Sequence, residues 1–150
     1  MNVQGFPFID STPLRVCHIK REKQHKVFDG YATKGHCSMG WFFGFKLHIV
    51  INDKGEIIDF LFNQGNIDDR ESLKNSLMQT SDRVLLRKRT LVETVNDELQ
   101  NTCQIEHTRH RSVDNFLSNL ISGLIAYHFL PKKPSLNLEV VDEKRVRKAA

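Results

Sequence analysis

Alternating apolar and polar residues predict one long strand in the first half of the chain. From Phe43 to Ile51 every second residue is apolar, which is the pattern of a strand with one buried face. Asn52-Asp53-Lys54-Gly55 then supplies turn residues, and residues 56–62 return as a second apolar run. The two runs therefore predict an antiparallel hairpin, which Gly65-Asn66 closes.

Two segments before this hairpin differ in character. The apolar run Phe6-Pro7-Phe8-Ile9 is followed directly by Asp10-Ser11-Thr12-Pro13, which predicts a short strand over residues 6–10 that ends in an aspartate. Residues 18–38 are polar, mixed in charge and without clear periodicity. They are expected to form a long loop.

The last third of the chain has the period of helices. A first helix begins at Thr90, with apolar residues three and four positions apart: Leu91, Val92, Val95, Leu99 and Cys103. The opposite stripe is polar and shares one face of that helix: Arg89, Glu93, Asn96 and Gln100. A second helix is predicted from an N-cap at Ser112 to the stop at Pro131.

The region between hairpin and helices is poor in core-forming residues. Asn66 and Asp68 are suited to cap a short helix, but residues 74–82 hold no apolar run long enough for a core strand. A compact α/β sheet requires more apolar sequence than this stretch offers.

Composition limits the chain to one domain. Its 150 residues, 39% of them hydrophobic, suffice for a single core over residues 1–130, followed by a basic, flexible tail over 131–150. There is no membrane-spanning or secretory pattern, so a cytoplasmic location is expected. The three cysteines contain no Cys-x-x-Cys pair and are expected to be reduced, and His18, His25, His36, Cys37 and His48 have none of the spacings of zinc sites.

Basic residues are concentrated rather than spread. The net charge is +4, from 22 basic and 18 acidic residues, and the basic ones gather at 15–26, at 107–111 and in the tail. Such clusters suit a polyanion such as DNA, although most basic stretches are simply solvated surface.

Asp10 and Glu93 form the candidate catalytic pair. An aspartate after a strand and a glutamate on a late amphipathic helix are how a ribonuclease-H-like nuclease presents its carboxylates. Magnesium takes oxygen ligands, and two ions clamp the attacking and leaving oxygens of a phosphoryl transfer. The alternative is that Asp10 only forms a turn and Glu93 only lies on the surface.

Whole phrases of the chain resemble the transposases of the insertion sequence 982 family, which belong with the DDE transposases. The matching phrases are Phe8-Ile9-Asp10-Ser11-Thr12-Pro13-Leu14-Arg15-Val16-Cys17, Gly40-Trp41-Phe42-Phe43-Gly44-Phe45-Lys46-Leu47-His48, Gly65-Asn66-Ile67-Asp68-Asp69-Arg70, Glu93-Thr94-Val95-Asn96-Asp97-Glu98-Leu99 and Gln104-Ile105-Glu106-His107-Thr108-Arg109-His110-Arg111-Ser112. They occur in the family's order and cover most of the chain.

The resemblance implies a ribonuclease-H-like mixed sheet with flanking helices and Mg²⁺- or Mn²⁺-dependent cleavage and joining of transposon ends. It makes Asp10 the first catalytic and metal-binding carboxylate and Glu93 the last. Arg89 and Glu93 keep the Arg-x3-Glu part of a signature found in related transposases, whereas Leu86 and Gln100 replace its tyrosine and lysine. The residues expected to contact DNA are Arg89, Asn96, Gln100, His107, Arg109, His110 and Arg111. For the intact family, the resemblance further implies a homodimer and association with the nucleoid when the protein is bound to DNA.

One catalytic residue of the family is missing. The second aspartate should follow a strand between the Asp68-Asp69-Arg70 helix and Glu93, and no such phrase is present. Asp53 comes too early, in the hairpin turn, and Asp68 and Asp69 are expected to be structural. An internal deletion is placed at residues 71–76, and the family's N-terminal helical region is also expected to be missing. The chain is then an impaired transposase, a DNA-binding module without catalysis, or a metal-dependent nuclease of another family.

Overall fold

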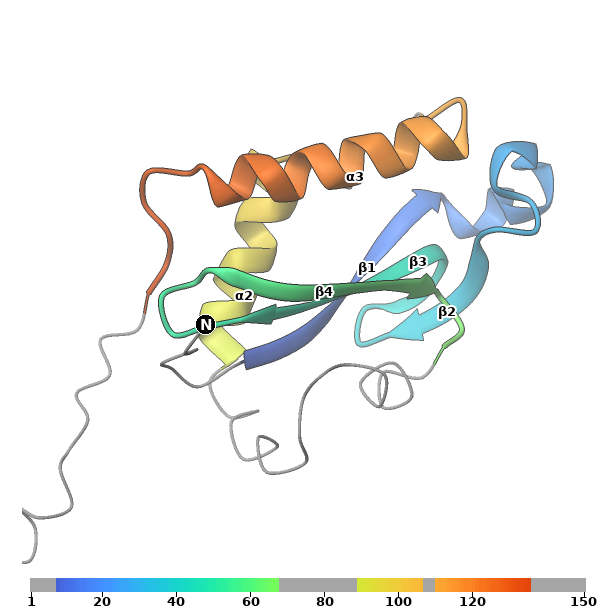
Figure 1. Ribbon diagram of the computed structural model, residues 1–150. Helices are drawn as coiled ribbons and strands as arrows, with labels where there is room; N and C mark the ends of the chain where they lie inside the picture. The colour runs from blue at the N-terminus through green and yellow to red at the C-terminus, as the bar shows by residue number, and fades with distance from the viewer. Residues whose placement is uncertain (1–7, 68–88, 107–109, 136–150) are drawn as a thin grey trace, which may run out of the picture.

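A computed structural model gives the three-dimensional arrangement of the chain and describes residues 8–67, 89–106 and 110–135 (Figure 1). Strand β1 (Phe8–Cys17) leads into two short 3-10 helices, η1 (Ile19–Gln24) and η2 (Lys26–Phe28). Strands β2 (Thr33–Cys37), β3 (Gly40–Ile51) and β4 (Ile57–Gln64) follow. Helix α2 (Arg89–Asp97) continues as a π-helical turn, η4 (Glu98–Thr102), and α3 (Val113–His128) comes last.

Strand β3 is the centre of a four-stranded antiparallel sheet. β1 pairs along one side of it, from Phe8 opposite Ile51 to Cys17 opposite Phe43. On its other side β2 pairs with the first residues of β3 and β4 with the remainder. The prediction that the segments 6–10, 43–51 and 56–62 share one sheet is confirmed for the described residues. The expected mixed sheet is not found among them, because every described pairing is antiparallel.

Strand β1 continues well past Asp10, so the prediction of a short strand ending there was wrong. Thr12, Leu14 and Val16 are buried in alternation, which keeps the segment extended against β3. Pro13 lies within the strand but donates no backbone hydrogen bond, and prolines are tolerated in strands at a sheet edge. In the described residues β1 pairs with β3 alone, and such an edge accommodates Pro13.

The long loop expected over residues 18–38 was also an incorrect prediction. Two 3-10 helices and strand β2 occupy most of it. This segment contributes few residues to the core, since only Phe28, Ala32 and Gly35 are buried in it. Three buried positions are too few to produce a helical or strand period in the sequence. A Cβ on Gly35 would lie 2.1 Å from the carbonyl oxygen of Gly65, so the close approach of β2 to the end of β4 requires glycine.

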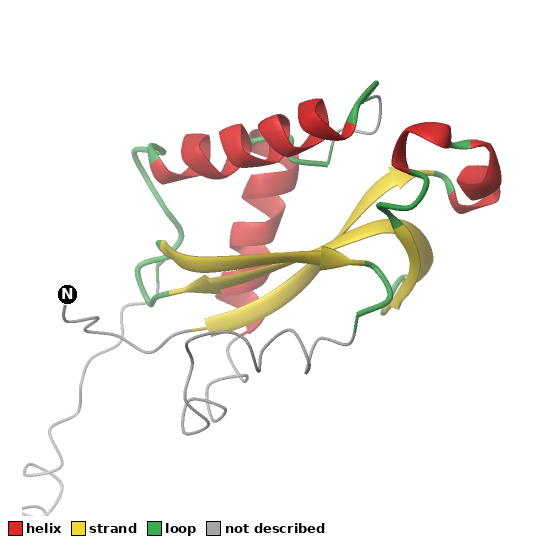
Figure 2. Ribbon diagram, turned by 45° about the vertical axis from the view of Figure 1, so that its right-hand side comes forward, coloured by secondary structure: helices red, strands yellow, loops and turns green. Residues whose placement is uncertain are grey.

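The core lies between the sheet and both helices, on one face of β3. Phe45, Leu47, Ile49 and Ile51 point into it, as the alternation predicted. Figures 1 and 2 show α3 running along the sheet and α2 crossing it at a steep angle. The helices contribute Leu91, Val92, Val95, Leu99, Phe116, Leu120, Leu124 and Tyr127 to the same cluster. The apolar stripe predicted for the first helix is therefore confirmed as its buried side.

Helix α3 is fixed at three points. The Ser112 side chain accepts a hydrogen bond from the Asn115 amide (3.1 Å), which confirms the predicted N-cap. At Gly123 a Cβ would lie 2.3 Å from a methyl of buried Ile105, so glycine permits the closest contact of this helix. At the other end the buried Tyr127 hydroxyl donates to the Gly55 carbonyl (2.7 Å) in the β3–β4 turn.

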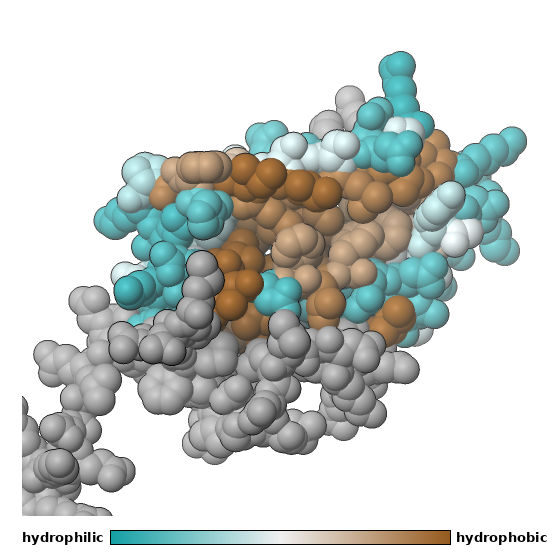
Figure 3. Space-filling view, in the orientation of Figure 1, coloured by the Kyte–Doolittle hydropathy of each residue, from teal (hydrophilic) through white to brown (hydrophobic). Residues whose placement is uncertain are grey.

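An apolar surface extends over α3 and β4 (Figure 3). The exposed large apolar side chains on these elements and just after α3 are Ile58, Phe60, Ile121, Ile125 and Phe129. Exposed apolar patches of this kind mark places where another layer of structure or a partner can pack.

Several predictions fall on residues that the structure does not describe. These are the short helix capped by Asp68, the junction at 71–76, and the tail from residue 136 onward. Among the described helices, none is both long and apolar enough to span a bilayer.

Candidate active site

Asp10 lies on the face of the sheet that the helices cover. It stands opposite Ile49 in the β1–β3 ladder, and directly opposed residues of an antiparallel pair project to the same side. Ile49 is fully buried in the core, so Asp10 points toward the helical layer. The carboxylate is half-buried, at the edge of the core. Thr12, opposite Leu47, shares this face one position further along.

Two side chains of the α2 segment bind these two strand residues. The Asn96 Nδ2 donates to Asp10 Oδ2 (3.1 Å), and the Gln100 Nε2 donates to Thr12 Oγ1 (2.9 Å). Alternate strand residues are roughly 6.7 Å apart, and residues four apart on a helix rise about 6 Å. The matching spacings let both bonds form together, and they fix the register of α2 against β1.

Glu93 lies three residues before Asn96 on the same stripe of α2 and is exposed. Because Asn96 contacts Asp10, the structure places the helix that carries Glu93 on the same side of the sheet as Asp10. Arg89 is the first residue of α2. Within the polar stripe seen in the sequence, Asn96 and Gln100 face β1, whereas Glu93 is exposed.

Glu98, the first residue of η4, belongs to a different environment from Glu93. Burial raises the pKa of Tyr127, and the nearby Glu98 carboxylate raises it further. Burial likewise raises the pKa of Cys103, with Glu98 as the second cause. Glu98 therefore lies toward Tyr127 and Cys103.

Two contacts of this region were not anticipated from the sequence. Thr12 receives Gln100, and Glu106 accepts the Arg15 amide through Oε1 (3.3 Å) further along β1. Extending β1 past Asp10 would have revealed Thr12, since it is the next residue on the same face. For Glu106 the only sequence signal was its place in the phrase from Gln104 to Ser112.

The residues expected to contact DNA divide into three groups. Asn96 is only 8% exposed and Gln100 is half-buried, and both are bonded to β1. Arg111 is exposed, whereas the His110 ring lies edge-on against Phe116 at 5.4 Å between centroids. His107, Arg109 and the side chain of Arg89 lie outside what the structure describes.

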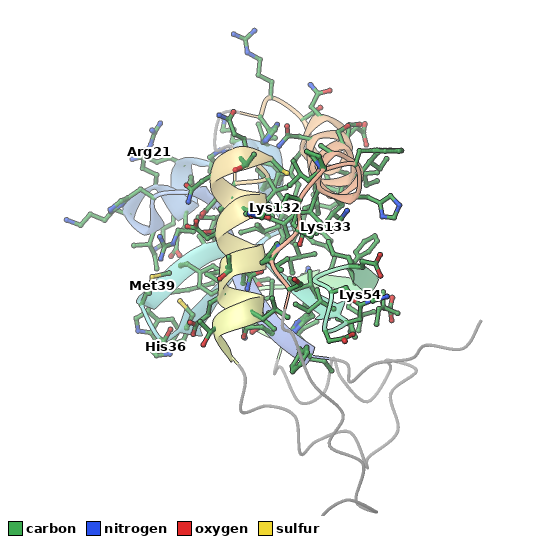
Figure 4. All side chains as sticks on the ribbon, turned by 90° about the vertical axis from the view of Figure 1, so that its left-hand side faces the viewer. Arg21, His36, Met39, Lys54, Lys132 and Lys133 are labelled. Carbon is green, nitrogen blue, oxygen red and sulfur yellow. The ribbon has the colours of Figure 1, made fainter. Side chains whose placement is uncertain are left out.

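The basic cluster at residues 15–26 forms an exposed surface beside β1. Its η1 and η2 helices expose Lys20, Arg21, Lys23 and Lys26. Figure 4, which looks onto α2, shows Arg21 at the outer side of the molecule, away from Lys54 of the β3–β4 turn. Lys133, in the tail, donates to the carbonyls of His128 and Leu130. Its ammonium group therefore caps the end of α3.

The carboxylates near Asp10 are few. Across residues 8–67, 89–106 and 110–135 no three His, Cys, Asp or Glu side chains gather where they could hold a metal ion. Asp53 lies in the β3–β4 turn, as predicted, and Asp68 and Asp69 are not described. Asp10 and Glu93 are the two candidate carboxylates that the described structure places on this side of the sheet.

Comparison with known proteins matches one family in two segments. The family is described as Transposase DDE domain, and the segments are residues 1–75 and 70–113. No curated protein matches the chain, and neither does any solved structure. The two segments together span residues 1–113 of 150 and include both Asp10 and Glu93. The chain therefore belongs to the transposase DDE domain family.

Proposed function

We propose that the chain is a DNA transposase domain of the insertion sequence 982 type, with a ribonuclease-H-like fold, that binds DNA but has lost strand cleavage and joining. The observation that carries this proposal is the placement of Asp10 on β1 under the α2 face that bears Glu93, in a chain of the transposase DDE domain family. In a two-metal transposase these are the positions of the first and last carboxylates.

The family match itself supports an internal deletion. One continuous domain is expected to match as one segment, whereas this chain matches in two that overlap at residues 70–75. That overlap includes residues 71–75 of the stretch 71–76, where a deletion would have removed the missing strand and its aspartate. Within residues 8–67, 89–106 and 110–135, β1 pairs on one side only, and an apolar surface extends over α3 and β4; both are features that an incomplete domain would have.

The residues present suit one metal ion better than two. Asp10 and Glu93 offer carboxylate oxygens, which Mg²⁺ and Mn²⁺ accept as ligands. When bound in such a site, the metal would stabilise charge on the phosphoryl oxygens. Holding two ions about 4 Å apart requires a further bridging carboxylate, and the described residues provide no group of three. Asp10 and Glu93 would therefore hold a single ion weakly, without the pair that strand transfer needs.

A nicking and strand-transfer assay tests the loss of catalysis. The substrate is DNA bearing the element's ends, with Mg²⁺ or Mn²⁺, and the chain is compared with a version in which the missing segment is restored from a full-length relative. We expect activity only in the restored version, and Asp10→Ala or Glu93→Ala should abolish it. Activity of the present chain that disappears in both alanine variants would overturn the proposal.

DNA binding without catalysis is favoured by the exposed cations of η1 and η2. Lys20, Arg21, Lys23 and Lys26 are exposed in the segment that follows β1, where they would contact phosphates without reading sequence. This binding needs no metal ion. It therefore survives the loss of the second aspartate.

A further inference from the structure

We propose that the β2–β3 hairpin carries a stacking site for an unpaired base of single-stranded DNA, with the indole of Trp41 as its platform and the neighbouring cations as phosphate contacts. The inference rests on the proposed function, in which the chain binds DNA. It adds the bases as a second point of contact, beside the phosphates. Neither the family match nor the carboxylate pattern assigns a role to this hairpin.

The first argument is the exposure of Trp41. Its side chain is 61% exposed, whereas the next residue of β3, Phe42, points to the other face of the strand and is buried. Core packing therefore does not account for the indole. An exposed indole presents a flat apolar surface, and every DNA base has a face that stacks on such a ring. Inside a duplex both faces of a base are already stacked, so the ligand that fits is an unpaired base.

The second argument is that β2 holds the ring in position. His36 is the cross-strand partner of Trp41, and the two rings form a T-shaped pair with centroids 5.1 Å apart. Lys34 Nζ lies over the indole, 5.3 Å from its centroid, as in a cation–π pair. The indole therefore has a defined position without DNA, while more than half of its side chain stays open. A ring that is already positioned loses little freedom when a base stacks on it, which favours binding.

The third argument is the charge around the ring, which complements DNA. Between residues 18 and 41 five cationic side chains stand against two carboxylates: Lys20, Arg21, Lys23, Lys26 and Lys34 against Glu22 and Asp29. Helix η1 contacts β3, the strand of Trp41. Figure 1 places η1 and the β2–β3 hairpin at the same end of the sheet, and Figure 4 shows Arg21 of η1 and His36 of β2 on the same side of the molecule. An aromatic ring among cations is the arrangement with which proteins hold single strands, because bases stack on the ring while phosphates meet the cations.

The test uses the fluorescence of Trp41, which is the one tryptophan of the chain and therefore reports on this site alone. The whole chain is titrated with a single-stranded oligonucleotide of mixed sequence and with an abasic strand of the same length, which has the phosphates but no bases. Unlabelled strands are used to follow the Trp41 emission, and end-labelled strands give the affinity by fluorescence anisotropy.

Trp41→Leu and Trp41→Phe are the paired variants. Both keep an apolar side chain that suits a strand, but only phenylalanine keeps an aromatic face. Phe129→Ala is the matched control, because it removes another exposed aromatic ring, just after α3. Dispersed amide spectra and thermal melts establish that each variant is folded.

We expect the single strand to quench the Trp41 emission and the abasic strand to bind without quenching it. Trp41→Leu should weaken single-strand binding roughly 5- to 150-fold, which corresponds to the loss of one stacked base, and leave the affinity for the abasic strand unchanged. Trp41→Phe should keep most of the single-strand affinity, and Phe129→Ala should keep all of it.

The inference is overturned if the single strand binds without changing the Trp41 emission, or if Trp41→Leu binds it as tightly as Trp41→Phe does. Quenching that follows protein concentration without DNA would identify a contact between copies of the chain and would also overturn it. Failure of both strands to bind would contradict the proposed DNA binding itself, and this site with it.

Discussion

The hydroxyl of Tyr127 should contribute measurably to the stability of the fold. Tyr127 is fully buried, and its hydroxyl donates to the Gly55 carbonyl at 2.7 Å. Tyr127→Phe removes the donor and leaves the carbonyl of buried Gly55 without this hydrogen bond. The expected loss is about 1–3 kcal/mol in the free energy of unfolding. For a chain of this length a loss of about 2 kcal/mol lowers Tm by roughly 4–8 °C.

The same residue predicts an alkaline loss of stability. Burial raises the pKa of Tyr127 above its ordinary value, and the Glu98 carboxylate adds to the rise. An unfolded tyrosine titrates near pH 10, so above that pH the folded state binds one more proton than the unfolded state. The contribution of Tyr127 is therefore fully present below about pH 10 and falls above it, by up to about 1.4 kcal/mol per pH unit.

Urea denaturation from pH 7 to pH 11 measures both effects. The stability difference between the unchanged chain and Tyr127→Phe should be constant up to about pH 9 and shrink above pH 10. Tyr31→Phe is the matched control, because Tyr31 is the other tyrosine of the chain and its ring is exposed. Cys17, whose pKa burial also raises, is common to all three chains and cancels. Parallel profiles for the unchanged chain and Tyr127→Phe above pH 10 would refute the reasoning.

Three further predictions concern the core, the sheet edge and DNA. Gly123→Ala should lower the free energy of unfolding by about 1–2 kcal/mol in urea titrations, because overpacking against Ile105 outweighs the gain in helix propensity. Ser122→Ala, at an exposed position of the same helix, is the control. A Gly123→Ala chain as stable as the unchanged one, or more stable, would contradict the close contact. The outward amides of β1 should exchange rapidly with deuterium because the proposed missing strand would have paired there, and strong protection in a dilute monomer would count against the deletion. DNA affinity should be weak, independent of sequence and steeply lowered by salt. Charge reversal in residues 15–26 or 107–111 should reduce the dependence of affinity on salt concentration, and binding that does not change with salt would exclude phosphate contacts as its source.

Periodicity predicted the parts of the fold in which one face of an element is buried continuously. The alternation from Phe43 to Ile51 gave the central strand, and the spacing from Leu91 to Leu99 gave the buried side of α2. Ser112 was identifiable as an N-cap because its side-chain chemistry is local. In each case the signal lies within one element and needs no partner to be read.

The failures had the opposite cause. β2 and the end of β1 depend on neighbours distant in sequence: Gly35 on Gly65, and Pro13 on a position at the sheet edge. The roles of Asn96 and Gln100 were equally invisible, because an amide on a polar stripe looks the same whether it faces DNA or a strand 86 or 88 residues earlier. Sequence spacing placed the correct residues on one face, but only the fold supplies what that face meets.

The proposed loss of catalysis is compatible with a retained core because the two depend on different sides of β1. The core is built by β1, β3, β4, α2 and α3, and its buried side chains come from the face of the sheet under the helices. The proposed missing strand belongs to the outer edge of β1, where its loss affects backbone pairing rather than this packed face. The aspartate of that strand, however, would have been the third carboxylate ligand of the metal site, beside Asp10 and Glu93. Mg²⁺ keeps its waters unless several protein oxygens are arranged around it, so the removal of one carboxylate abolishes a two-ion site that packing alone cannot restore.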